Sequence, residues 1–246
     1  MKRLIERFIA TYGDKYRQKY LISEDKEKLC SDWLEALRFF FDRSFMGGRV
    51  DVVSAKFKKK RALTVVESWK NTLEKCWNLG VNWDKKRLKG DLSRRKVNKG
   101  LDRDMVIQTL EFISRKRNYN IVLHSLNKIR NQETKELFGE LNLIANVAEK
   151  KAALFIRDLV DLFGLEESIS EDAFIYLQPI DTWVHQVCRR HLRILTSENP
   201  SWKEDAPKIV KHCLSLEISP VKFNQGAWYI GTHSLEILFE ILQEKN

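Results

Sequence analysis

Helical periodicity is the feature that most constrains the fold of this 246-residue chain. Nearly all of its apolar residues recur at spacings of three and four, and only four prolines and ten glycines interrupt them. This spacing places apolar side chains on one face of a helix. No alternating strand pattern persists for more than a few residues, and the stretch FIYLQP (174–179) is the best candidate for an extended segment. We therefore expect an all-α protein.

The same pattern sets the bounds of the predicted helices. Apolar stripes define their central turns, and capping residues, glycines and prolines define their ends. Helices are expected over residues 2–20, 25–45, 50–78, 103–117, 120–130, 133–145, 149–163, 181–195, 204–215 and 232–244.

The basic segment DKKRLKGDLSRRKVNKG (84–100) is the best candidate for a boundary between two helical lobes. It holds eight Lys or Arg against two Asp, together with two glycines. Such a density of like charge favours an exposed, partly mobile connection. We predict an N-terminal helical lobe over 1–80, a basic connection over 81–102 and a second lobe over 103–246, with the two lobes arranged around a cleft.

The net charge of +10 suits a polyanionic partner such as DNA. The positive charge is concentrated in KFKKKR (56–61) and in the segment 84–100. A merely solubilising surface would carry the same lysines, so the charge alone leaves both interpretations open. The candidates for phosphate contacts in the second segment are Lys85, Lys86, Arg94 and Arg95.

The composition argues against several classes of protein. Hydrophobic residues make up 43% and charged residues 32%, which is typical of a folded, soluble chain. No run approaches the 18 apolar residues that span a bilayer, and Glu6 interrupts the first apolar stretch, unlike a signal peptide. The four cysteines form no C-x-x-C pair and the five histidines show no ligand spacing. We expect reduced thiols, a cytoplasmic location, no membrane partner and no metal.

The segment FGELNLIANVAEKKAALFIRDLVDLFGL (138–165) predicts two helices with a short break near 145–149. A break of this length makes a helical hairpin. The second helix opens with Lys150 and Lys151, at the end where the helix dipole disfavours a cation. The same field and partial burial favour the neutral amine, which is the nucleophilic form. Two solvent-exposed lysines are the alternative interpretation.

The segment YLQPIDTWVHQVCRRHL (176–192) predicts a helix that starts at an aspartate. Pro179 ends the preceding element, and Asp181 stands where an N-cap is expected. Capping alone is a sufficient reason for this carboxylate and stabilises a helix by about 1 kcal/mol. Arg189 and Arg190 lie further along the helix, where they can meet phosphates.

A third segment, 217–242, places Asn224 and Trp228 four residues apart, so a helix would put them on one face. An amide and an indole on one face can read and stack a base. The alternative is a tryptophan packed in the core with the asparagine on a turn.

The order of these segments resembles that of a known enzyme superfamily. KKAALF followed by QPIDTWV looks like the lysine and aspartate motifs of the helix-hairpin-helix DNA glycosylases, and SPVKFNQGAWYIG is similar to a segment of the archaeal 8-oxoguanine DNA glycosylase family. The resemblance covers roughly residues 130–235 and leaves the N-terminal third unmatched. It implies a helix-hairpin-helix element in the C-terminal lobe.

The resemblance also implies roles for individual residues. The hairpin lysine attacks C1′ of the damaged nucleotide and forms a Schiff base, and Asp181 activates the lysine and stabilises the cationic sugar. Trp228 stacks on the flipped base. Asn224 stands where the family has Asp, and this departure leaves the damaged base open, because an amide is a weaker acceptor than a carboxylate.

Two registers compete for the nucleophile. Aligning Val147 with the valine of the superfamily's hairpin selects Lys150, but Ala148 then stands where the hairpin has glycine. Aligning Phe155 with an aromatic that sandwiches the base four residues after the nucleophile selects Lys151. Positions i and i+4 share one helix face, so we favour Lys151 with Phe155.

The resulting prediction is a prokaryotic, nucleoid-associated DNA N-glycosylase and AP lyase. It would act as a monomer on double-stranded DNA containing a damaged base, 8-oxoguanine being favoured, and would need no cofactor. Two alternatives remain: a glycosylase for another damaged base, and a non-catalytic helical module that binds DNA.

Overall fold

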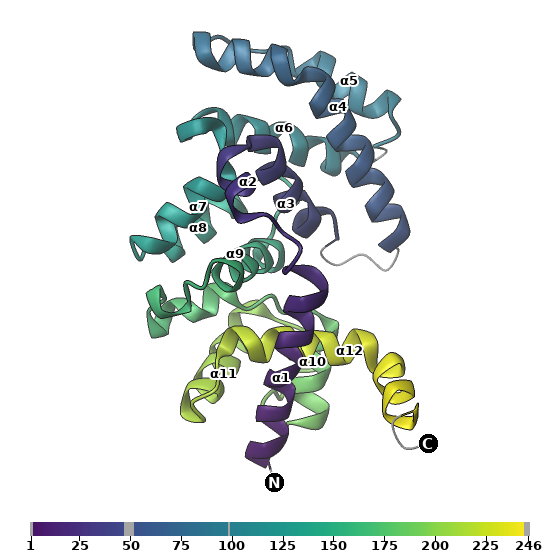
Figure 1. The fold of residues 1–246 in the computed structure, drawn as a ribbon, viewed down its shortest axis with the longest axis vertical. Helices are drawn as coiled ribbons and strands as arrows, with labels where there is room; N and C mark the ends of the chain where they lie inside the picture. Colours follow the sequence, from purple (N-terminus) through teal and green to yellow (C-terminus); the bar gives the residue numbers. More distant parts are fainter. Residues whose placement is uncertain (1, 47–51, 98, 244–246) are drawn as a thin grey trace. The chain divides into compact units, whose positions relative to one another are not determined.

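The chain leaves its first structural unit after the N-terminal helix and returns to it in the C-terminal third (Figure 1). The computed structural model describes residues 2–46, 52–97 and 99–243, and in these ranges it shows helices and turns but no strand. The expected all-α class is confirmed for this part of the chain. Unit 1 comprises Met1–Glu24 and Ile156–Asn246, and unit 2 comprises Asp25–Phe155.

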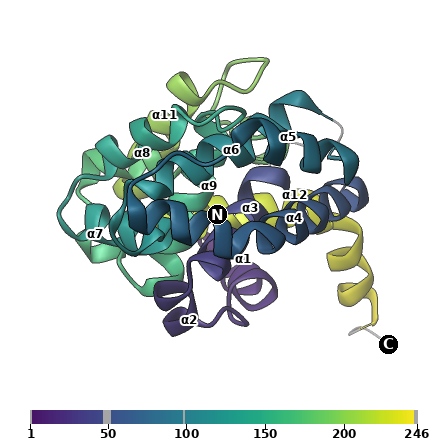
Figure 2. The ribbon, with the colours of Figure 1, turned by 90° about the horizontal axis from the view of Figure 1, so that it is seen from above.

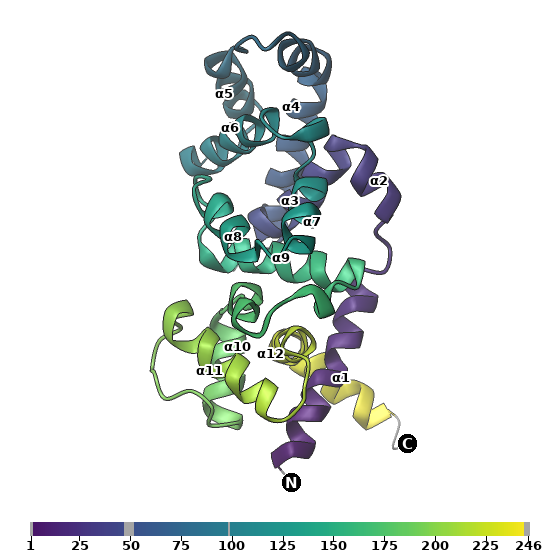
Figure 3. The same cartoon turned by 90° about the vertical axis from the view of Figure 1, so that its left-hand side faces the viewer.

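Unit 1 is built on two long helices, α1 (Lys2–Tyr20) and α12 (Pro220–Gln243), which pack against each other and cross as Figure 3 shows. Two shorter helices, α10 (Thr182–Gln186) and α11 (Trp202–Ser215), contact α12. The remaining elements are the C-terminal part of α9 (Glu149–Phe163), 3-10 turns at Glu166–Ser168 and Glu171–Leu177, and a π-helical turn at Val187–His191.

Glycines allow the backbones of α1 and α12 to approach closely. A β-carbon added to Gly226 would overlap the carbonyl oxygen of Ile9, and one added to Gly13 would overlap the backbone of Lys222. Both positions therefore require a residue without a side chain. The two ends of the chain are joined in one unit through this contact.

The core of unit 1 follows the predicted helical spacing. Its buried residues include three pairs four positions apart: Val184 of α10 with Cys188 of the following π-helical turn, Ile209 with Cys213 on α11, and Phe223 with Ala227 on α12. This spacing aligns the apolar face of each helix with the common core.

Unit 2 contains the long helix α4, which contacts α3 and α5, and several shorter helices. The elements are α2 (Lys26–Ser31), α3 (Trp33–Met46), α4 (Val52–Leu79), α5 (Lys85–Arg94), α6 (Gly100–Ser114), a 3-10 turn at Arg117–Tyr119, α7 (Ile121–Arg130), α8 (Thr134–Asn142) and the first turns of α9. Helix α5 contacts both α4 and α6, as Figure 2 shows.

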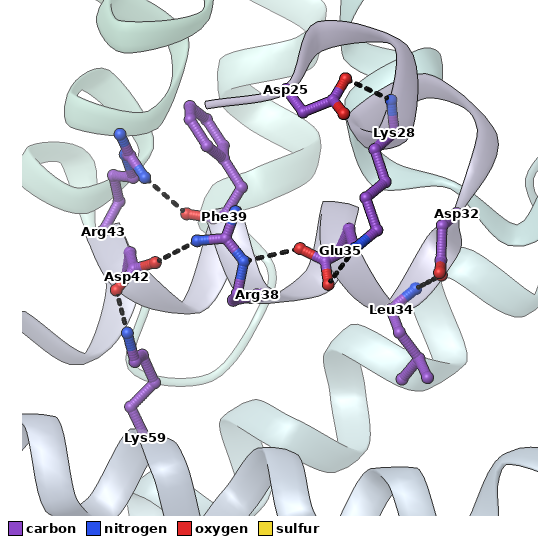
Figure 4. Close-up of polar contacts among 10 residues, drawn as sticks. All are labelled: Asp25, Lys28, Asp32, Leu34, Glu35, Arg38, Phe39, Asp42, Arg43 and Lys59. Carbon is purple, nitrogen blue, oxygen red and sulfur yellow. Dashed lines mark hydrogen bonds and ion pairs between the residues drawn. The ribbon is translucent and has the colours of Figure 1, made fainter. Parts of the chain in front are cut away.

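The helix predicted over 25–45 is observed as two helices, α2 and α3, and an aspartate stands before each of them. Asp25 caps α2 by accepting a hydrogen bond from the N–H of Lys28 at 3.0 Å. Asp32 ends α2 in an extended conformation and accepts from the N–H of Leu34 at 2.8 Å, at the start of α3 (Figure 4). A capping aspartate satisfies a backbone donor that the first turn leaves unpaired, so a new helix starts here.

Charged side chains connect α3 to α4. The guanidinium of Arg38 donates to Glu35 at 2.8 Å and to Asp42 at 3.2 Å, and Lys59 of α4 also pairs with Asp42 (Figure 4). The hydrogen bond from Arg38 is the main reason why the pKa of Glu35 is lowered. These pairs are partly exposed, so each stabilises the unit by at most about 1 kcal/mol.

The observed division into units differs from the predicted one. Residues 85–94 form helix α5 and not an irregular connection, because Leu88 and Leu92 are fully buried beneath its charged surface. The indole N–H of Trp69 on α4 donates to Asp91 at 2.9 Å and attaches α5 to the rest of the unit. The segment 81–102 therefore lies within unit 2, and the units divide after Glu24 and after Phe155.

Three other predicted elements have different bounds. Helix α12 begins at Pro220 and not at 232, because proline suits the first position of a helix. The helix predicted over 181–195 ends as an α-helix at Gln186 and continues as the π-helical turn to His191. The candidate extended segment at 174–179 is largely the 3-10 turn that ends at Leu177.

A partly buried histidine, His124, makes the stability of the protein dependent on pH. His124 lies with Nε2 2.7 Å from Glu140, and its pKa is lowered chiefly by burial, against the effect of that carboxylate. The unfolded chain therefore binds a proton more readily, and stability is lost as pH falls below the unfolded pKa of about 6.5. We expect the free energy of unfolding, measured in urea, to decrease from pH 7.5 to pH 5.5, and His124→Gln to reduce this decrease. An identical pH dependence in the variant would contradict the assignment.

Candidate functional site

Lys151 is a nearly buried lysine at the beginning of α9. Only 9% of its surface is exposed, and its Nζ donates to the backbone carbonyl of Asn146 at 2.7 Å. Lys150 is half-buried. The interpretation of two solvent-exposed lysines is therefore wrong for Lys151, whose amine is held at the connection between α8 and α9.

The connection over 143–148 is fixed by hydrogen bonds to α6. The N–H of Ala145 donates to Gln108 at 2.6 Å, and the amide of Asn146 donates to the buried Asp102 at 3.0 Å. Asn146 has a φ of 61°, a left-handed conformation that asparagine adopts more readily than most residues. These contacts hold the carbonyl oxygen that binds Lys151 in a defined place.

Asp181 is the N-cap of α10, as predicted. Its Oδ1 accepts hydrogen bonds from the N–H groups of Trp183 and Val184, both at 2.9 Å, and its backbone is extended. The side chain is half-buried in unit 1. The cap fixes the orientation of the carboxylate at the start of the helix.

Phe155 does not have the surface that its predicted role requires. Its side chain is fully buried in unit 2, where its ring packs edge-on against Phe40 at 5.0 Å and Phe39 at 5.9 Å between centroids. A base cannot stack on a ring that is enclosed in this way. The predicted base-binding role of Phe155 is therefore not supported by the structure, and its aromatic ring belongs to the core.

Asn224 and Trp228 lie on one helix, α12, which excludes the alternative of an asparagine on a turn. Asn224 is fully buried, and its Oδ1 accepts from Nη1 of Arg157 at 2.7 Å. Its Nδ2 has no hydrogen-bond partner within the described part of the chain. Trp228 is half-buried and meets the rings of Tyr16 and Tyr20 edge-on, each at 5.6 Å.

Arg157 and Asp158 form a buried ion pair that sequence reasoning missed. Nε and Nη2 of Arg157 donate to Asp158 at 3.1 and 2.8 Å, and both side chains are 1% exposed. The hydroxyl of Tyr16 donates to the same carboxylate at 3.0 Å, and the guanidinium lies 4.7 Å from the Tyr16 ring. The available signal was an Arg-Asp pair inside the apolar stretch AALFIRDLV.

The predicted phosphate-binding residues are distributed over both units. Arg189 and Arg190 belong to the π-helical turn of unit 1, where Arg189 lies 3.8 Å from Glu198. In unit 2 the four predicted residues lie in or next to α5 and are exposed: Lys85, Lys86, Arg94 and Arg95. Lys85 pairs with Glu111 and Arg94 with Asp91. A phosphate can replace such exposed partners at small cost, since solvent screens an exposed ion pair.

Neither a metal-binding cluster nor a membrane-spanning helix is found in the described residues. Within residues 2–46, 52–97 and 99–243, no group of three or more histidine, cysteine, aspartate or glutamate side chains could hold a metal ion. In the same ranges no helix combines the length and the apolar character needed to span a bilayer. No family model matches the chain, and no match to it was found among the curated proteins or the solved structures.

Proposed function

We propose that the protein is a DNA N-glycosylase with AP-lyase activity that excises an oxidised purine, with 8-oxoguanine favoured. The observation that carries the proposal is the placement of Lys151, a lysine nine-tenths buried in the first turn of α9 with its amine held against a fixed connection. A lysine amine shielded from water is suited to nucleophilic attack. In this proposal α8, the connection and the start of α9 form the helix-hairpin-helix element.

The proposed reaction exchanges one bond at C1′ for another. The neutral amine of the lysine attacks C1′, the bond between C1′ and the damaged base breaks, and the base leaves with a proton. Loss of a proton from the attached amine and opening of the sugar ring give the Schiff base. Asp181 would stabilise the positive charge that the sugar carries as the base departs.

Binding of the damaged DNA would use the aromatic and basic residues already described. A base in a duplex is reached only after it has been flipped out, and it then needs a surface on which to stack. The half-buried Trp228 would supply that surface. The cations of α5 and of the π-helical turn would contact phosphates, which position the duplex without reading its sequence.

The departure from the family's aspartate at Asn224 leaves a second candidate substrate, another damaged purine, although the asparagine itself is fully buried. A guanidinium only donates hydrogen bonds, so Oδ1 of Asn224 must face Arg157 and Nδ2 must face away from it. The amide therefore offers a donor where the family's aspartate offers an acceptor.

Covalent trapping tests the proposed function. The protein is incubated with duplexes containing 8-oxoguanine, hypoxanthine, uracil or undamaged guanine in the presence of borohydride, which reduces a Schiff base to a stable amine. We expect an adduct of protein and DNA with a damaged purine and none with guanine. An absence of adduct on every lesion would overturn the lyase proposal and leave the non-catalytic DNA-binding module as the better interpretation.

Substitutions of Asp181 distinguish its role as a helix cap from its proposed role in catalysis. Asparagine caps a helix as well as aspartate does, whereas alanine does not. We expect Asp181→Asn to keep its stability within about 0.5 kcal/mol and to lose on the order of 10²-fold or more in base excision. Asp181→Ala should lose about 1 kcal/mol of stability in addition. Single-turnover excision and thermal unfolding measure the two effects, and full excision by Asp181→Asn would show that the residue is only a cap.

A further inference from the structure

Unit 2 contains a pocket of about 210 Å³ that is lined by none of the proposed catalytic or base-binding residues and shares only Lys85 with the proposed phosphate contacts. It lies where α4 ends, beside the turn 80–84 and the C-terminal end of α6. The turn is set by Gly80, whose φ of +66° suits glycine, and by a hydrogen bond from the N–H of Val81 to the carbonyl of Cys76 at 2.9 Å. The pocket wall is therefore a defined part of the fold.

Two tryptophans, Trp77 and Trp83, line the pocket and are each 8% exposed. The Nε1 of Trp77 is buried and has no acceptor in the described part of the chain. By contrast, Trp33 donates to Glu74 at 2.8 Å and Trp69 to Asp91 at 2.9 Å. A buried donor without an acceptor costs roughly 1–3 kcal/mol. The two indoles give the pocket an aromatic wall, and the Nε1–H of Trp77 has no competing acceptor in the described residues.

The rim of the pocket is positively charged. Lys85 lies 6.0 Å from the ring of Trp83 and pairs with Glu111, and both charged groups line the pocket. Arg115, a third lining residue, is exposed, and its guanidinium forms no ion pair with any described residue. Two cations against one anion favour an anionic group at the opening.

We propose that this pocket binds a nucleotide, with the base against its aromatic wall and the phosphate at Lys85 and Arg115. Its volume is below the roughly 300–1,000 Å³ of pockets for drug-sized ligands. It accommodates one ring system and leaves a phosphate outside, at the cationic rim. Stacking on aromatic side chains tolerates any base. The ligand is a free mononucleotide or a nucleotide of a single DNA strand, which share this chemistry, and the site is independent of Lys151 and Asp181.

Titration of the full-length protein with dAMP, deoxyadenosine, inorganic phosphate and a short single-stranded oligonucleotide tests the site. The readout is the Nε1–H resonance of Trp77, assigned with Trp77→Phe. We expect dAMP to shift this resonance, deoxyadenosine to bind about tenfold more weakly, and phosphate alone to leave it unchanged, because a charge-assisted bond to phosphate contributes about 1.4 kcal/mol. An oligonucleotide that displaces dAMP would identify a DNA strand as the source, and one that does not would identify the free nucleotide.

Matched arginine variants complete the test. Arg115→Gln should weaken dAMP binding about tenfold. Arg117→Gln, an exposed arginine that does not line the pocket, should leave binding unchanged. A Trp77 resonance that does not move at millimolar dAMP, or equal affinity in the wild type and Arg115→Gln, would overturn the proposal. Neither result would depend on the glycosylase activity.

Discussion

Lys151→Gln is expected to abolish the borohydride-trapped adduct, whereas Lys150→Gln retains it. An amide has no nucleophilic lone pair, so loss of the reacting amine should lower Schiff-base formation by on the order of 10³-fold or more. The assignment to Lys151 follows from its burial and from the hydrogen bond that holds its amine at Asn146. Single-turnover trapping of both variants on the best lesion measures the difference.

The same hydrogen bond means that Lys151 also has a structural role, which must be separated from chemistry. Its loss should cost about 1 kcal/mol, as is usual for a single hydrogen bond. Lys151→Arg keeps a cationic donor at this position but is not a usable nucleophile, since arginine stays protonated. We expect this variant to fold, to bind damaged duplex and to form no adduct. Loss of the adduct in Lys150→Gln alone would select the register of Val147, and an adduct in both glutamine variants would refute the hairpin nucleophile.

Asp158→Ala is expected to reduce the free energy of unfolding by about 3–5 kcal/mol, the largest stability effect predicted for this protein. The substitution leaves the guanidinium of Arg157 buried without its counter-ion and removes the acceptor of the Tyr16 hydroxyl. A buried charge without a partner is far more costly than the pair itself. Urea unfolding of the wild type and the variant measures the difference.

Two further variants identify the cause of this effect. Arg17→Ala removes a pair with Asp161 at 2.5 Å in the same unit, but the arginine is 39% exposed and the cost should not exceed about 1 kcal/mol. Arg157→Met combined with Asp158→Leu removes both charges and should recover most of the stability, because apolar side chains of similar size can replace a buried pair. If the double variant were as unstable as Asp158→Ala, the unpaired charge would not be the cause.

Features of the fold that depend on interactions within one short segment could be predicted from the sequence. The bounds of α9 were predicted correctly because its apolar spacing and the break before Glu149 lie within one segment. Asp181 was predicted as an N-cap because proline and aspartate fix a helix start from their own conformations. The placement of Asn224 and Trp228 on one helix also followed from spacing alone.

The segment 81–102 shows where local reasoning fails. Its charge favoured a mobile connection, yet two leucines four residues apart, Leu88 and Leu92, are buried against neighbouring helices. A high charge density indicates that the polar face of a segment is exposed to solvent. Whether its apolar face is buried depends on the helices that pack against it. The contact from Trp69 to Asp91 comes from a residue 22 positions away and could not be read from the segment itself.

The sequence by itself determined the all-α class, most helix centres, the capping role of Asp181 and a lysine in the first turn of α9. Only the tertiary structure decided that α1 joins α12 in one unit, that Lys151 is buried against Asn146, that Phe155 belongs to the core and that Arg157 pairs with Asp158 and holds Asn224. Periodicity and capping arise from interactions within a few residues. Burial and the pairing of charges depend on residues that are distant in the chain, and they become defined only when the helices pack.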